Sequence, residues 1–133
     1  MAVSIRKRTI FKHANCLSTD NIGDMVYLTG PSVGGLLSVA KIDIDAIDPK
    51  YAFGMIVAKS TSTFCTVQKE GEVKDIYSGL QPGKTLWVDH NARLNHDVPS
   101  APGLGVRLVQ RAALALDVNL LFINIQQPLF KIP

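Results

Sequence analysis

Short strand-like segments, each closed off by turn-forming residues, recur along most of this chain and constrain its fold more than any other feature. Six segments are rich in β-branched and aromatic residues. They are GDMVYLTG (23–30), LLSVAKI (36–42), FGMIVAKS (53–60), TFCTVQK (63–69), TLWV (85–88) and LLFINI (120–125). Turn sequences rich in Gly, Pro, Asn and Asp separate them, as at Gln81-Pro82-Gly83. This pattern predicts an all-β fold, either a small antiparallel β-barrel or a sandwich.

The stretch from Val106 to Asp117 fits two kinds of secondary structure. A helix would place on one face Val109, Ala112, Ala113 and Leu116. A strand would place on one face Val106, Leu108, Ala112, Leu114 and Leu116, with Arg107, Arg111 and Asp117 on the other. Because strand signals lie on both sides of this stretch, we expect a strand.

The length of 133 residues is enough for one ordinary hydrophobic core, so we expect a single β domain over residues 18–125. The core is predicted from the apolar members of the strand alternations. These residues are Val26, Leu28, Ile56, Val67, Leu86, Val88, Leu108, Leu121 and Ile123.

The two ends of the chain differ from this middle, and we expect both to be extended arms. All four bases of residues 1–17 precede the first acidic residue, Asp20, so they account for the net charge of +3. The C-terminal arm, residues 126–133, contains two prolines, which a central strand would not tolerate. Apolar side chains on such arms need a surface to cover them. The predicted partner-binding residues are Ile5, Arg6, Lys7, Arg8, Ile10, Phe11, Lys12, Leu129 and Phe130.

Several groups of residues resemble parts of metal-binding or catalytic sites, but none has a complete motif. Asp43, Asp45 and Asp48 lack the glycine and the closing glutamate of a calcium loop. His90 and His96 stand beside aspartates in turn-rich sequence without a third ligand, so surface positions are expected. His13 lies in the N-terminal arm and adds no ligand. No catalytic residue, metal ligand or cofactor is predicted, and we expect the protein not to be an enzyme.

The two cysteines, Cys16 and Cys65, are far apart in the sequence and have no metal-ligand spacing. No secretory signal precedes them, so we expect synthesis in a cytoplasm and buried free thiols. The apolar runs are too short for a transmembrane helix, and no membrane partner is expected.

Nucleic-acid binding is the main alternative from another functional class. Arg6, Lys7, Arg8 and Lys12 could neutralise phosphates. The aromatic residues Tyr27, Tyr51, Tyr77 and Trp87 are not interleaved with basic clusters, as a base-stacking surface would require. An acidic protein surface is therefore the preferred partner of the basic arm.

Two stretches of sequence resemble a β-domain of tailed-bacteriophage virion proteins, in particular capsid decoration (cement) proteins and head fibres. They are YSGLQPGKTLWVDHNARL (77–94) and VRLVQRAALALDVNLLFIN (106–124). The positions that carry the likeness are Gly79, Leu80, Pro82, Gly83, Trp87, Ala115, Leu116, Leu120 and Leu121. DNIGDMVYLTG (20–30) and FGMIVAKSTSTFCTVQKEGEV (53–73) are similar to the first half of that domain, so the likeness covers residues 18–125.

The resemblance implies a structural protein of the virion that binds the assembled major capsid protein shell and stabilises it. It also implies a homo-oligomer, a dimer or a trimer. Head fibre, collar and tail proteins remain alternatives because they share such β-domains. A small nucleic-acid-binding barrel is a further alternative.

Overall fold

The computed structural model describes residues 9–46, 50–99, 108–127 and 129–130, and these residues form strands and turns without a helix. The strands are β1 (Thr9–Asn15), β2 (Met25–Leu28), β3 (Val39–Lys41), β4 (Gly54–Lys59), β5 (Phe64–Lys74), β6 (Thr85–Val88), β7 (Leu94–Asn95), β8 (Leu108–Val109), β9 (Arg111–Asp117), β10 (Leu120–Ile123) and β11 (Leu129–Phe130). The prediction of an all-β fold is confirmed.

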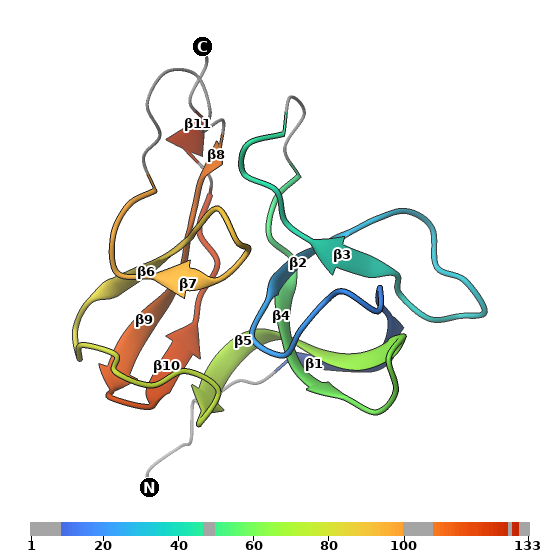
Figure 1. The fold of residues 1–133 in the computed structure, drawn as a ribbon, viewed down its shortest axis with the longest axis horizontal. Helices are drawn as coiled ribbons and strands as arrows, with labels where there is room; N and C mark the ends of the chain where they lie inside the picture. The colour runs from blue at the N-terminus through green and yellow to red at the C-terminus, as the bar shows by residue number, and fades with distance from the viewer. Residues whose placement is uncertain (1–8, 47–49, 100–107, 128, 131–133) are drawn as a thin grey trace, which may run out of the picture.

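Eight strands follow one another in a single curled sheet that forms a half-barrel, in the order β3-β2-β4-β5-β10-β9-β6-β7 (Figure 1). All pairings between these strands are antiparallel. Strand β1 also joins this sheet by pairing with β5, while β8 and β11 form a separate antiparallel pair. We call residues 9–70 the N-terminal half and residues 71–127 the C-terminal half.

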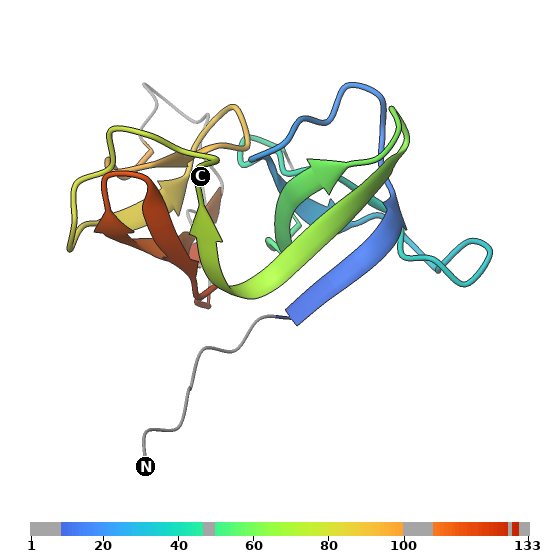
Figure 2. The ribbon, with the colours of Figure 1, turned by 90° about the horizontal axis from the view of Figure 1, so that it is seen from below.

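The long strand β5 belongs to both halves. Up to Glu70 it pairs with β1 and β4, and from Gly71 to Lys74 it pairs with β10. Gly71 is buried and has a φ of 106°, a backbone conformation that other residues rarely adopt. A glycine of this kind permits the bend at which β5 passes from one half to the other (Figure 2).

The main hydrophobic core lies between the two halves. The N-terminal half contributes, among others, Met25, Ile44 and Met55, and these pack with C-terminal residues such as Leu86 and Leu121. A smaller cluster lies within the N-terminal half and consists of Ala14, Cys16, Val26, Val39, Ile56, Cys65 and Val67. The halves therefore share one core and behave as one folding unit.

Eight of the nine predicted core residues are buried, and Leu28 is the exception. Leu28 ends β2 and is 43% exposed. The prediction for Leu28 is wrong because β2 ends at this residue and the exposed residues 29–35 follow, so the Leu28 side chain is not covered by the core.

The strand predicted between Val106 and Asp117 is confirmed for the described residues as β8 and β9. The predicted inner face is correct at Leu108 and Ala112 and wrong after Ala112. Ala113 and Ala115 are buried, whereas Leu114 and Leu116 are exposed. The cause is a β-bulge: Leu86 pairs with Ala113 and Trp87 with Arg111, so Ala112 is an extra residue in β9. A bulge reverses the alternation after it.

Candidate functional site

Part of the predicted N-terminal arm belongs to the sheet. Ile5, Arg6, Lys7 and Arg8 lie outside the described residues. Ile10, Phe11 and Lys12 belong to β1, which pairs with β5 from Thr9 to Asn15. Ala14 and Cys16 of this region fill the smaller core cluster and hold it against the rest of the fold. Partner binding by these residues stays a prediction.

The predicted C-terminal arm also includes a paired segment. Leu129 and Phe130 form β11, opposite Val109 and Leu108 of β8. Partner binding by Leu129 and Phe130 likewise stays a prediction.

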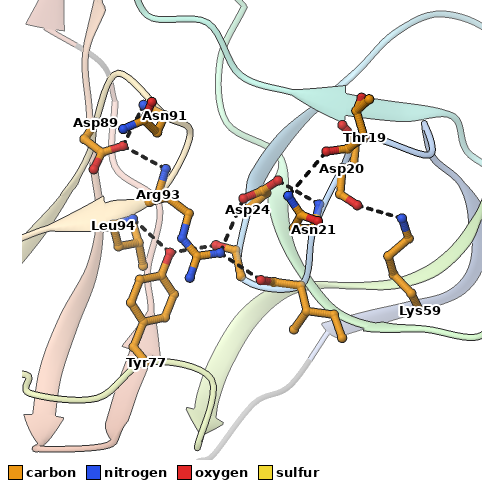
Figure 3. A network of polar contacts seen from close by, with 12 residues as sticks. Thr19, Asp20, Asn21, Asp24, Lys59, Tyr77, Asp89, Asn91, Arg93 and Leu94 are labelled. Atoms are coloured by element: carbon orange, nitrogen blue, oxygen red, sulfur yellow. Dashed lines mark hydrogen bonds and ion pairs between the residues drawn. The ribbon is translucent and has the colours of Figure 1, made fainter. Parts of the chain in front are cut away.

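A polar network joins the two halves beside the main core (Figure 3). The Tyr77 hydroxyl donates to the carbonyl of Gly23 at 2.7 Å and accepts from the backbone N–H of Leu94 at 2.9 Å. The Arg93 guanidinium lies 4.7 Å from the centre of the Tyr77 ring and donates to the carbonyl of Ile22 at 2.8 Å. It also lies 3.4 Å from the buried carboxylate of Asp24. Desolvation by burial raises the pKa of Tyr77 to about 12.

A hollow of about 430 Å³ opens next to this network, and its lining includes Asp24, Lys41, His90 and Arg93. Most of its charged groups already have partners. Asp24 is bound by Arg93, and His90 Nδ1 lies 2.8 Å from a carboxylate oxygen of Asp45. We interpret this hollow as part of the connection between the halves, because Asp24 of the N-terminal half and Arg93 of the C-terminal half pair in its lining.

The two cysteines, distant in sequence, come together in the smaller core cluster. Both are free and buried, and a hydrogen bond with the Cys16 thiol contributes to the raised pKa of Cys65. Desolvation by burial is the largest cause and raises that pKa to about 12. Such thiols are poor nucleophiles, since the reactive thiolate is disfavoured. Sequence reasoning missed this proximity because it follows from the pairing of β1 with β5.

The structure gives hydrogen-bond partners to Asp43, Asp45, His90 and His96. The Asp43 carboxylate accepts the backbone N–H of Asp45 at 3.0 Å, while Asp48 lies outside the described residues. His96 Nε2 accepts the backbone N–H of Gln81 at 3.0 Å. Within the described ranges, no group of His, Cys, Asp or Glu has an arrangement that could hold a metal ion.

Two exposed leucines and two half-buried aromatic residues lie near one another on the outer side of the C-terminal half. Leu114 of β9 is 40% exposed and lies in register between Phe122 of β10 and Thr85 of β6. Leu116 lies two residues further along β9 and is 38% exposed. Trp87 of β6 pairs with Arg111 of β9 at the other end of this surface. We call the five residues Trp87, Arg111, Leu114, Leu116 and Phe122 the outer face.

The outer face departs from the pattern of a sheet that simply meets water. One-sided antiparallel sheets usually present polar side chains to solvent. Contiguous apolar side chains on such a surface mark sites of contact with another molecule. The strand alternation predicts Leu114 and Leu116 on the buried side of β9, but the bulge at Ala112 places them on the exposed side.

Comparison of the chain with descriptions of protein families, with curated proteins and with solved structures finds no match. Within the part of the chain that the structure describes, no helix is long and apolar enough to cross a membrane. The outer face and the segments beside it are the candidate functional site, because Leu114 and Leu116 are exposed there.

Proposed function

We propose that this chain is a capsid decoration (cement) protein of a tailed bacteriophage, which binds the assembled shell of major capsid protein and stabilises it. The observation that carries the proposal is the outer face, where Leu114 and Leu116 lie exposed beside Phe122. A protein that acts by covering another protein needs such a surface, and burying it on the shell would add interface area.

Two further features support the proposal. The sequence of residues 18–125 resembles the β-domain of decoration proteins and head fibres. The four bases Arg6, Lys7, Arg8 and Lys12 could meet acidic groups on a shell. A homo-oligomer, a dimer or a trimer, would match the symmetry of a shell.

The test is binding to phage particles that lack this protein, measured by co-sedimentation. The double variant Leu114→Asp with Leu116→Asp places two charges on the outer face. We expect it to stay folded, because both side chains are exposed, and to bind at least about tenfold more weakly. Circular dichroism checks the fold.

A matched control carries the same change on the N-terminal half. Leu17 and Val33 are 55% and 66% exposed, and the double variant Leu17→Asp with Val33→Asp should bind as the unmodified protein does. Equal binding by the unmodified protein and both variants would remove the outer face from the proposal. Failure of the unmodified protein to bind particles would refute the cement function itself.

A further inference from the structure

The bulge at Ala112 leaves a small pit in the outer face. Ala112 and Ala113 are both buried, so β9 presents no exposed side chain between Arg111 and Leu114. A hollow of about 150 Å³ occupies this position. Its lining consists of Thr85, Arg111, Ala113, Leu114, Asn124 and Gln126.

Hydrogen-bond donors surround the pit, and Arg111 is the one charged residue in its lining. The Arg111 guanidinium lies 5.9 Å from the centre of the Trp87 ring, which limits the directions it can take. Among the described residues, no carboxylate lies within ion-pair distance of Arg111. Thr85 of β6 contributes a hydroxyl group to the lining, and Asn124, the residue that follows β10, contributes a side-chain amide.

We infer that this pit receives a carboxylate side chain from an apolar segment of another protein. The charge of Arg111 supplies the attraction, and a guanidinium can hold a carboxylate by two parallel hydrogen bonds. Leu114, Leu116 and Phe122 would meanwhile cover apolar side chains on either side of that carboxylate. The inference rests on the proposed function, since it specifies the chemistry of the partner at the same surface.

The size and surroundings of the pit favour this occupant. Sites for small-molecule ligands are usually about 300–1,000 Å³ in volume, whereas this pit has room for about one side chain. Nucleic acids need several cations that follow the phosphate backbone. A single cation among leucines suits a single carboxylate, and Trp and Arg are the residues most enriched at the centres of protein interfaces.

The experiment uses two blocked peptides, acetyl-Thr-Leu-Thr-Glu-Thr-Leu-Thr-amide and the same peptide with Gln in place of Glu. Binding to the full chain is followed by the fluorescence of Trp87, the one tryptophan of the sequence. We expect the Glu peptide to bind about tenfold more tightly than the Gln peptide, which corresponds to about 1.4 kcal/mol. The preference should shrink as salt is added.

Two variants of Arg111 test whether this residue causes the preference for the Glu peptide. Arg111→Gln should abolish it, and Arg111→Lys should keep only part of it, because lysine offers charge without the two-pronged geometry. The matched control is Lys41→Gln, which removes one charge from β3 in the other half and should keep the full preference. Arg111 is exposed and Lys41 is partly exposed, and thermal unfolding checks that each of the three variants is folded.

Equal binding of the two peptides, or a preference that survives Arg111→Gln, would overturn the inference. Tighter Arg111-dependent binding of a single-stranded oligonucleotide would assign the pit to nucleic acid instead. Arg111-dependent self-association in sedimentation would assign it to a second copy of the chain. If the protein binds particles but shows no preference between the peptides, the inferred carboxylate site is refuted and the proposed function stands. If the protein prefers the Glu peptide but does not bind particles, the proposed function alone is refuted.

Discussion

Tyr77 connects the two halves of the molecule through one buried hydroxyl. Replacing it with phenylalanine leaves the carbonyl of Gly23 and the N–H of Leu94 without this partner. We expect Tyr77→Phe to lower the free energy of unfolding by about 1–3 kcal/mol at pH 8. Chemical denaturation measures this change. Tyr27→Phe is the control, since Tyr27 packs on the same core and has no hydrogen bond through its hydroxyl within the described structure.

The same tyrosine predicts a specific dependence on pH. Its pKa is about 12 in the folded protein and about 10 in the unfolded chain, because burial disfavours the phenolate. The stability that neutral Tyr77 provides is therefore complete below pH 10 and is lost as the pH rises towards 12. The difference in stability between the unmodified protein and Tyr77→Phe should shrink over this range. A difference that stays constant up to pH 12 would contradict the burial of this hydroxyl.

Leu121 tests the core between the halves. It is 1% exposed and belongs to the cluster that both halves share. Leu121→Ala should cost about 2–5 kcal/mol of unfolding free energy, from lost burial and the cavity left behind. Leu28→Ala makes the same chemical change at a side chain that is 43% exposed and should cost clearly less. Similar losses at both positions would mean that the core is wrongly placed.

At the scale of strands, Gly54 sets how closely β4 lies against β5. A Cβ atom at Gly54 would lie 2.8 Å from the backbone oxygen of Gln68 and 2.7 Å from a methyl carbon of Val67. Gly54→Ala should therefore push the strands apart and lower the free energy of unfolding by about 1–3 kcal/mol. Gly30→Ala is the control, since nothing lies within 4 Å of the added atom. Equal melting temperatures for the two variants would contradict this close approach.

The N-terminal segment can now be tested without damage to the sheet. Deleting residues 1–8 removes Arg6, Lys7 and Arg8 but keeps β1 complete. We expect the truncated protein to bind particles more weakly than the full-length protein. We also expect added salt to weaken the binding of the full-length protein more than that of the truncated protein. Co-sedimentation measures both. If the truncated protein binds as tightly as the full chain, these residues take no part in docking.

Strand positions followed from the sequence, whereas the pairing of distant strands did not. Strand β6 around Leu86 alternates between half-buried and buried residues, so its local pattern predicts its burial. Strands β2 and β4 bury consecutive residues, Met25 with Val26 and Met55 with Ile56, so there the pattern predicts the strand but not both of its faces. Strand β1 has no clean period, and its place beside β5 depends on Ala14 and Cys16 filling a gap in a distant part of the chain. The bulge at Ala112 depends on the partner strand β6, so no pattern within β9 could reveal it. The outer face was missed for this reason.

At the scale of the whole molecule, one curled sheet folds its two halves onto a shared core and leaves its outer side exposed. The polar contacts of Tyr77, Arg93 and Asp24 connect the halves, while Leu114 on the outer face is exposed. The proposed structural role requires both a well-packed core and an exposed apolar surface that can form an interface.

The most direct test of the proposed cement function is the number of copies of this chain in purified particles of the phage that, on this proposal, encodes it. Quantitative mass spectrometry counts these copies against the major capsid protein. The account predicts hundreds of copies, in a fixed small-number ratio to the shell protein, as symmetry of a shell requires. A few to a dozen copies would indicate a collar, fibre or tail part. Absence of the chain from purified particles would contradict the account altogether.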